Sequence, residues 1–457
     1  MRANFSVALR RGASIFQAPP PAEWLLVAFR LCLGVLVVVD AATRIPDAGI
    51  FLTDAGLFPS SLQEPWRPSL LNLADGEGWA VAFLAVYGAC GAAIALGIRP
   101  RLASLLAWFL VLSIHHRNPC VTNGGDFLLR MTLLWSVFLP LDSGWSLLRR
   151  SARPARWLPG VWTIYRVQIA AMYLVTAVHK LVGGAWLGGD ALANALRLVE
   201  YARPSAAAIA ANGNLLPLLS FAVVFTQLVA GAGLLLRPAW VRGVSVAMLA
   251  GMQVGFLVCF DIALFPWIGL VTLIPLLPIS AMKATELEPW GWRSVVAVCV
   301  ATVTISFAVF SPLNPTDDTT PEKLLKLLGL NQRWTMFVSP SPESHRVAVM
   351  VGEGLGRMDL IREAARGDGT FTDGPFGGTG GLYPSARWTA FLVALADGAM
   401  PGGEASQRMV ARRLGERYAA KFPDLARDGW RVVVFTRDNR TGVAFHDRSL
   451  ARSEEAR

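Results

Sequence analysis

The amino-acid sequence predicts an all-α membrane protein with about nine transmembrane helices, followed by a small soluble α/β domain. Of its 457 residues, 54% are hydrophobic and 16% are charged, whereas soluble domains average about 25% charged residues. The apolar residues gather in runs of near-bilayer length up to Phe310, and the composition then becomes that of a soluble domain. We therefore expect a basic cytoplasmic leader at 1–23, a transmembrane domain at 24–311 and a small extracytoplasmic α/β domain at 312–457.

Nine apolar runs are candidate spans, because a helix needs about 20 predominantly apolar residues to cross a bilayer. They are Trp24–Val39, Trp79–Ile98, Leu102–His115, Phe127–Leu141, Val161–Leu181, Leu215–Leu236, Val241–Val258, Ile262–Ile279 and Trp292–Phe310. No small-residue cleavage site follows the first run, so we expect it to remain as a membrane anchor.

The arginines and lysines between these runs predict the orientation. With the N-terminus in the cytoplasm, the inside segments carry thirteen such residues and the outside loops carry five, as the positive-inside rule requires. Nine spans then place 312–457 outside. The formal net charge of +10 does not indicate nucleic-acid binding, since the cations lie between spans and not along one soluble face.

The five cysteines show no CxxC or CxxxC spacing, so the sequence predicts neither a metal site nor thiol redox chemistry. Cys120 lies in an outer loop and has no obvious partner. We interpret it as a free thiol, with a functional thiol as the alternative.

Ionisable residues inside the run Val161–Leu181 indicate a helix that faces protein and not lipid. Arg166, Tyr173 and Lys180 are seven residues apart, so they share one helix face. Lys180 is therefore a candidate reactive group. The alternative is a lysine that snorkels to the lipid headgroups.

The glycine-rich segment Gly183–Asp190 follows Lys180 and contains Trp186, a residue type that suits a membrane interface. Its glycines permit the backbone to turn back close to the helix end. A snorkelling lysine would not need such a segment.

The polar stretch His115–Asp126 joins the third and fourth runs on the outer side. Asn123 is a good helix N-cap, and Asp126, three residues later, favours the helix dipole. Arg130 follows Asp126 by four residues, so the two can pair on one face. This structural interpretation covers these three residues and leaves the histidines at the start of the stretch unexplained.

Consecutive helical hairpins usually pack together, so we expect His116, Asp126 and Lys180 to meet in one outer pocket.

The part beyond Phe310 has the pattern of a small α/β domain. We expect an amphipathic helix at Pro321–Leu328, strands at Arg346–Val351 and Trp430–Phe435, and helices at Ala386–Ala396 and Glu404–Phe422. The segment Gly377–Gly381 lacks the lysine of a phosphate-binding loop, so we expect a flexible turn there.

Four motifs together resemble the horizontally transferred transmembrane (HTTM) domain, which vitamin K-dependent gamma-carboxylases share with many bacterial homologues. The motifs are His116–Asn118, Asn123–Arg130, Tyr173–Lys180 and Trp186–Gly189. The resemblance covers roughly residues 20–310, and 328–337 look like the segment that often follows the domain. The bacterial homologues imply a place in the bacterial inner membrane.

This resemblance implies that Lys180 is the base that deprotonates reduced vitamin K or a related quinol. Burial disfavours an ammonium ion, so a lysine in a dry site can be neutral and accept a proton. In the family, oxygen then adds to the quinol anion, and the strong base so formed removes a glutamate γ-proton before carbon dioxide adds. The implied partners are membrane lipid, the quinol and a peptide or protein glutamate, without nucleic acid or metal.

The resemblance also implies catalytic roles for His116 and Asp126 beside Lys180, and quinol-binding roles for Asn123, Tyr173 and Trp186. The alternative is a non-catalytic HTTM protein with a partner, immunity or quinone-binding role. Retention of the lysine and of the polar outer loop favours the enzyme. A C-terminal part much shorter than that of the carboxylases favours the alternative.

Overall fold

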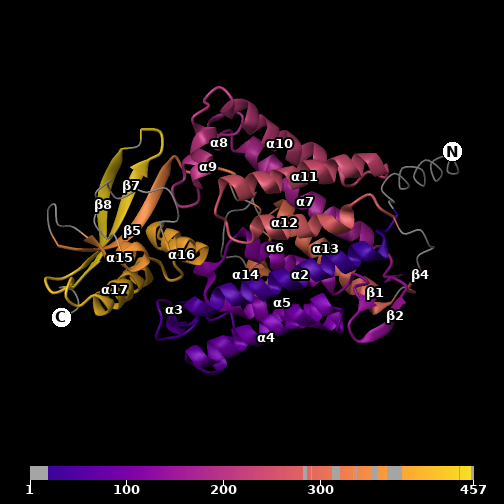
Figure 1. Ribbon diagram of the computed structural model, residues 1–457, viewed down its shortest axis with the longest axis horizontal. Coiled ribbons are helices and arrows are strands. Elements are labelled where there is room, and N and C mark those ends of the chain that lie inside the picture. Colours follow the sequence, from indigo (N-terminus) through magenta and orange to yellow (C-terminus); the bar gives the residue numbers. More distant parts are fainter. Residues whose placement is uncertain are drawn as a thin grey trace.

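The computed structural model describes residues 19–280, 286–289, 291–310, 320–332, 334, 337–352, 358–367, 383–441 and 443–453. Most of the leader at 1–23 and the whole segment Gly377–Gly381 lie outside these residues. The described chain forms a helical bundle with a small sheet at one end (Figure 1). We call this end of the bundle, next to strand β5 (Glu343–Val351), the sheet end.

Each of the nine predicted runs contains one helix. These helices are α2 (Glu23–Arg44), α4 (Glu77–Leu96), α5 (Pro100–Arg117), α6 (Gly124–Ser136), α7 (Val161–Val182), α10 (Leu216–Gly233), α11 (Ala239–Cys259), α12 (Phe265–Leu273) and α13 (Trp292–Phe310). Among the described residues, five helices are long and apolar enough to cross a membrane: α2, α4, α7, α10 and α11. Helix α5 is more polar, α6 and α12 are shorter, and only Trp292–Ile305 of α13 is described with its side chains. The count of nine spans is therefore not confirmed and stays a prediction.

Helix α12 joins the two halves of the bundle, because it packs against α2 and α6 on one side and α11 on the other. Helix α7 lies between α10 and α13. Helices α2 and α4 approach each other closely where Gly34 and Gly91 face each other. A Cβ on Gly91 would lie 2.8 Å from the Gly34 carbonyl oxygen and 2.8 Å from the Val37 Cβ.

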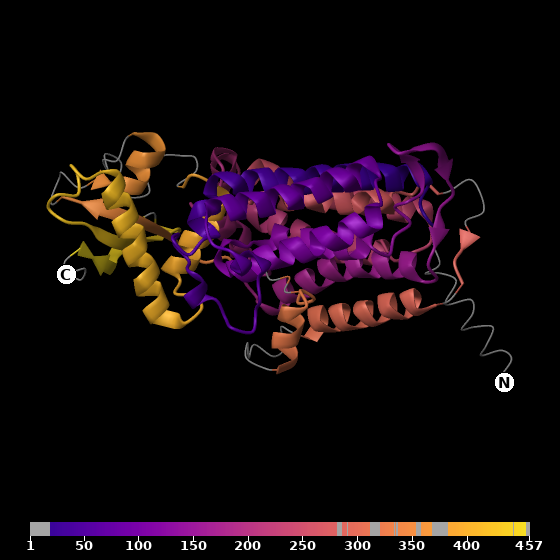
Figure 2. The ribbon, with the colours of Figure 1, turned by 90° about the horizontal axis from the view of Figure 1, so that it is seen from below.

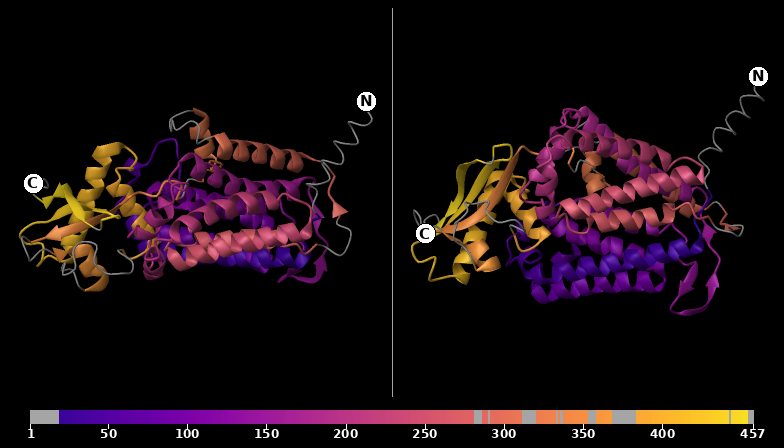
Figure 3. Two further views of the ribbon diagram at one scale, coloured as in Figure 1. Left: turned by 90° about the horizontal axis from the view of Figure 1, so that it is seen from above. Right: turned by 45° about the horizontal axis from the view of Figure 1, so that its top comes forward.

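A short hairpin closes the end of the bundle opposite the sheet (Figures 2 and 3). Its strands are β1 (Gly144–Ser146) and β2 (Arg149–Arg153). Arg30 of α2 is fully buried and donates hydrogen bonds to the Leu141 carbonyl oxygen, at 2.8 Å, and to the Trp145 carbonyl oxygen. This buried arginine therefore ties the hairpin to the first helix.

The C-terminal part contains a four-stranded antiparallel sheet in the order β6–β5–β7–β8. Besides β5, its strands are β6 (Met358–Asp359), β7 (Arg431–Asp438) and β8 (Ala444–Arg452). The helices are α14 (Thr320–Leu327), α15 (Leu360–Arg366), α16 (Ala386–Ala396) and α17 (Gly403–Lys421). The predicted strands and helices of this part are confirmed to within a few residues, and Figure 2 shows α17 beside the sheet.

The sheet packs through alternating side chains, as expected for a strand with two faces. Val347, Val349 and Val434 belong to the main core, and both α16 and α17 contact β5. The neighbouring residues Ala348 and Met350 face the other side and form a separate small cluster with Val433.

Candidate functional site

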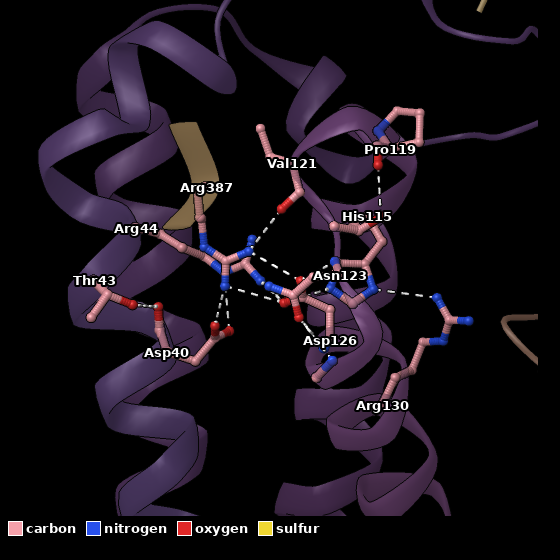
Figure 4. Close-up of polar contacts among 12 residues, drawn as sticks. Asp40, Thr43, Arg44, His115, Pro119, Val121, Asn123, Asp126, Arg130 and Arg387 are labelled. Carbon is pink, nitrogen blue, oxygen red and sulfur yellow. Dashed lines mark hydrogen bonds and ion pairs between the residues drawn. The ribbon is translucent and has the colours of Figure 1, made fainter. Parts of the chain in front are cut away.

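Two buried carboxylates and two buried arginines form one network at the sheet end of the bundle (Figure 4). Arg44 contacts Asp40 through Nε, at 3.0 Å, and Asp126 through Nη2, at 2.6 Å. Arg387 of α16 contacts Asp40 at 2.5 Å and also contacts Asp126. The carboxylates therefore lie between one arginine from the bundle and one from the C-terminal part.

The start of α6 is built as the sequence predicts. The Asn123 side chain accepts hydrogen bonds from the backbone N–H groups of Gly125 and Asp126, and Asp126 Oδ2 accepts one from the Asn123 N–H at 2.7 Å. This reciprocal capping box satisfies backbone donors at the helix start. Since Asn123 and Asp126 perform a structural task, their presence in the motif does not by itself indicate catalysis.

The predicted pairing of Asp126 with Arg130 is wrong. Arg130 instead contacts His115, with 3.3 Å between Nη1 and Nδ1, and donates to the Asn331 side chain at 3.0 Å. Asp126 already accepts hydrogen bonds from Arg44, Arg387 and its own cap. Two arginines that are distant in sequence thus replace the local partner.

His116 lies between two carbonyl groups. Its Nδ1 is 2.9 Å from the Pro68 oxygen and its Nε2 is 3.1 Å from the Lys326 oxygen. A neutral imidazole carries only one N–H. Both contacts are therefore hydrogen bonds only when the ring of His116 is protonated.

A cavity of about 410 Å³ lies beside these histidines. Its lining includes Arg67, His115, His116, Arg130 and Lys326, and no described carboxylate side chain. Arg67 and Lys326 form ion pairs with Glu64 and Glu322, whereas Arg130 contacts His115 and Asn331. Arg130 is therefore the cation of this lining that suits an anionic ligand.

A second and larger cavity adjoins this one, because the two share lining residues that include Asn123.

Lys180 is 2% exposed near the end of α7. Its Nζ donates to Oε1 of Gln227 on α10 at 3.2 Å and lies 4.4 Å from the centroid of the Trp186 ring. Within the described part of the chain no carboxylate pairs with this amine. Lys180 therefore does not snorkel, and it is held by a neutral amide and an aromatic face.

Trp186, expected to suit a membrane interface, is covered by protein. Its side chain is 2% exposed, and its Nε1 donates to the carbonyl oxygens of Phe337 and Val338 at 2.9 and 3.0 Å. Gly184 and Gly189 have positive φ angles of 72° and 84°, which glycine adopts without steric cost. These glycines let the chain turn back, so the indole covers the end of α7.

The shared face predicted for Arg166, Tyr173 and Lys180 is confirmed, since all three side chains are buried. Arg166 donates to the Leu234 carbonyl oxygen at the end of α10. The Tyr173 hydroxyl accepts a hydrogen bond from Gln253 of α11 at 3.1 Å. The face therefore points at α10 and α11.

Described residues between 326 and 338 contact both the histidine region and Trp186, which covers Lys180. The Lys326 oxygen contacts His116, and Asn331 contacts Arg130. Further along, Gln332 exchanges two hydrogen bonds with Gln168 of α7, at 2.6 and 3.2 Å. The end of this stretch then holds Trp186 through backbone carbonyls.

The structure thus brings together only part of the predicted site. Asn123 and Asp126 lie in the charge network, and Asn123 also lines the cavity next to His116. Lys180, Tyr173 and Trp186 contact α10, α11 and the 337–338 backbone instead. No described contact joins Lys180 to His116 or Asp126, and Lys180 lines neither cavity. A single pocket holding all three remains a prediction.

Cys120 is a buried free thiol, 3.4 Å from the Met400 sulfur. Burial raises the pKa of this thiol to about 12. Because the thiolate is the reactive form of cysteine, its environment favours an inert side chain.

Sequence reasoning missed Asp40, Gln227 and Arg387. Asp40 and Arg44 are four residues apart at the end of the first apolar run, and such a charged pair was a usable signal. Gln227 joins α10 to α7 through Lys180, and nothing in its local sequence marks that partner. Nothing in the local sequence marks Arg387.

Comparison with known protein families finds one match: the model of the HTTM domain fits residues 19–279. The matched region includes α2 to α12, both carboxylates of the charge network and Lys180. No curated protein and no solved structure matches the chain. The family match covers more than half of the 457 residues and agrees with the motifs around Asn123 and Lys180. The chain therefore belongs to the HTTM domain family.

Proposed function

We propose that this protein is an integral membrane enzyme of the vitamin K-dependent carboxylase type, in which Lys180 is the general base. It would act on a lipid-soluble quinol and drive carboxylation of a glutamate or coupled quinol epoxidation. The observation that carries the proposal is the burial of an amine whose described partners, Gln227 and Trp186, are both uncharged.

The surroundings of Lys180 fit proton uptake by Nζ. An ion pair with a carboxylate would hold the amine in its charged form, and the described residues supply none. The Trp186 ring attracts a cation, so it stabilises the ammonium that forms when Nζ takes a proton. Gln227 accepts one N–H and fixes the direction of the amine.

The residues around Lys180 also fit the chemistry of a quinol. Trp186 belongs to a small buried apolar cluster with Ala177, Ala191 and Val224, and apolar surroundings of this kind suit an aromatic ring. When bound, reduced vitamin K or a related quinol would supply a hydroxyl of ordinary pKa near ~10 and the reducing equivalents. Lys180, Tyr173 and Trp186 would hold it.

The basic cavity beside His116 gives the proposal a place for an anionic substrate. Its Arg130 suits the carboxylate of a peptide glutamate, with His115, His116 and Asn123 in the same lining. Asp126 has a positioning role here, since four hydrogen bonds already occupy its two oxygens.

The protein is proposed to lie in the bacterial inner membrane. Its N-terminus would be in the cytoplasm, and the sheet end would be on the outer side. The support is the ratio of thirteen to five arginines and lysines. Reporter fusions after Ser341 test this orientation. If a reporter that works only in the cytoplasm is active when fused after Ser341, the proposed orientation is reversed.

The test of the reaction uses purified protein in detergent micelles, a reduced naphthoquinone, a glutamate-containing peptide and labelled bicarbonate. We expect quinol-dependent label in the peptide, and loss of that label in Lys180→Ala. Lys421→Ala is the control, since Lys421 lies on α17 and away from the described contacts of Lys180.

Quinol epoxidation without peptide labelling would support the quinol chemistry and leave the second substrate open.

The rival function is that of a non-catalytic HTTM protein with a partner, immunity or quinone-binding role. The tight cover of Lys180 by Trp186 and the 337–338 backbone favours it. Quinone binding by the purified protein without any quinol oxidation or peptide carboxylation would support the non-catalytic function.

A further inference from the structure

A large cavity lies between the sheet end of the bundle and the C-terminal part. Its volume is about 950 Å³. The loop 198–201 and Asp261 line its bundle side, and His345 and Asp397 line its C-terminal side. A space of this size can hold a small molecule or several residues of a peptide.

The loop that carries Glu200 is held from both sides. On the bundle side, the Asp261 N–H donates to the Tyr201 carbonyl oxygen at 2.7 Å, and Ala202 forms a β-bridge with Phe260. On the C-terminal side, the Val199 N–H donates to the Ser344 hydroxyl at 3.1 Å. Glu200 is therefore fixed at the junction of the two parts.

Glu200 is 8% exposed and only one of its carboxylate oxygens has a partner. Oε1 accepts a hydrogen bond from the His345 N–H. Oε2 is buried and has no hydrogen-bond partner in the described chain. The nearby Ser344 hydroxyl accepts from the Val199 N–H and lies 2.9 Å from the Asn439 side chain.

A buried polar group without a partner is costly, which points to a missing ligand.

Acidic groups dominate the cavity around Glu200. Asp261, Glu343 and Asp397 line it together with His345. The two fully cationic residues of the lining, Arg67 and Lys326, form ion pairs with Glu64 and Glu322. Asp261 in turn contacts Arg203, and Asp397 contacts His345. The lining still holds five carboxylates, of Glu64, Glu200, Asp261, Glu343 and Asp397, against two fully cationic side chains, so the cavity favours a positively charged ligand.

An organic cation fits this cavity better than a metal ion. Among the described residues, no three His, Cys, Asp or Glu side chains come close enough to hold a metal. An ammonium group offers three N–H donors in different directions, so it can reach Oε2 of Glu200 and a second carboxylate. The apolar residues Phe265, Phe337 and Met400 line other parts of the cavity and suit an aliphatic chain.

We propose that this cavity binds a primary ammonium group, carried by a small polyamine or by a lysine side chain of a peptide, with Glu200 as its buried counter-ion. The inference does not use Lys180 or any step of the proposed reaction. Failure of the bicarbonate assay would therefore leave it standing.

The first experiment uses wild-type full-length protein in detergent at pH 8, where calorimetric titration measures binding. The probes are spermidine, a tri-lysine peptide, and the same peptide acetylated on every amine. We expect saturable binding of at least one amine probe and none of the acetylated peptide. Binding of spermidine alone identifies a small amine, and binding of the peptide alone identifies a peptide side chain. Equal binding of the acetylated peptide, or no binding of either amine, would overturn the proposal.

The second experiment measures the same titrations with Glu200→Gln, which keeps the shape and removes the charge. We expect affinity to fall at least about tenfold, since removing one partner of a buried charge pair is costly. Glu416→Gln is the matched control, because Glu416 is exposed on α17 and pairs with Arg412. Asp397→Asn provides a second lining variant with an expected smaller loss. Unchanged affinity in Glu200→Gln, or an equal loss in the control, would contradict the assignment.

Discussion

Arg387 and Asp126 are joined by two hydrogen bonds, at 3.2 Å from Nη1 to Oδ2 and 3.1 Å from Nη2 to Oδ1, across 261 residues of sequence. Arg387 also donates to the Val121 carbonyl oxygen at 3.0 Å and contacts Asp40. These carboxylates hold the pKa of Arg387 above its ordinary value. One side chain therefore links the first turn of α16 to α2, to α6 and to the loop before α6.

Arg387→Ala should destabilise the protein by about 3–5 kcal/mol, because it leaves two buried carboxylates with a single arginine, Arg44. Thermal unfolding in detergent measures this loss. Arg408→Ala is the control, since Arg408 forms an exposed pair with Glu404 and such pairs contribute about 1 kcal/mol or less. Equal midpoints for the two variants would show that the network is not needed for stability.

Local features of the fold could be predicted from the sequence, whereas the partners of the charged groups could not. The cap at Asn123 depends on residues within one turn, and α16 was predicted with its observed ends. The position of Asp126 was also predicted, but its partner was assigned to Arg130, the nearest cation on its helix face. The true partner on α16 is set by the packing of two distant parts, which no local pattern records.

The same distinction applies to Lys180. Its buried helix face follows from a seven-residue spacing that sequence reasoning detects. The position of Trp186 over Lys180 does not follow from that spacing, because backbone carbonyls of Phe337 and Val338 hold the Trp186 indole. Backbone acceptors carry no sequence signal, so the partners of the Trp186 indole could not be predicted.

Gly91→Ala should destabilise the α2–α4 pair. The new methyl group would lie 2.8 Å from the Gly34 carbonyl oxygen, and overpacking of this kind costs about 1–3 kcal/mol. Gly78→Ala on the same helix is the matched control, since nothing lies within 4 Å of its Cβ position. There the better helix propensity of alanine should raise stability slightly. Thermal midpoints measure both, and a stabilised Gly91→Ala would refute the close contact.

Glu200 should make stability depend on pH. Burial raises its pKa to about 7 from an ordinary value of 4.5, while the His345 N–H lowers it and Asp397 raises it further. The folded protein therefore keeps this proton at pH values where the unfolded chain has lost it. The contribution is fully present below about pH 4.5 and is lost as pH rises to about 7, amounting to about 3 kcal/mol.

Glu200→Gln cannot ionise, so its thermal midpoint should fall less between pH 5 and pH 8 than that of the wild-type protein. The charged and titratable groups that interact with Glu200 include His345, Asp397, Tyr201 and Tyr383, and all are unchanged in this variant. Glu416→Gln should keep the wild-type pH dependence. A Glu200→Gln variant with the wild-type slope would place the titration elsewhere.

Lys180→Arg separates a base from a structural cation. Arginine keeps the positive charge and does not release its proton in proteins. If Nζ accepts a proton, this variant should lose quinol turnover by about a hundredfold or more, while expression remains near wild type. Lys180→Met, which removes the charge at similar length, shows whether the fold itself needs a cation between Gln227 and Trp186. An active Lys180→Arg enzyme would exclude the general-base role, because the only group that could then act at this position is a permanent cation.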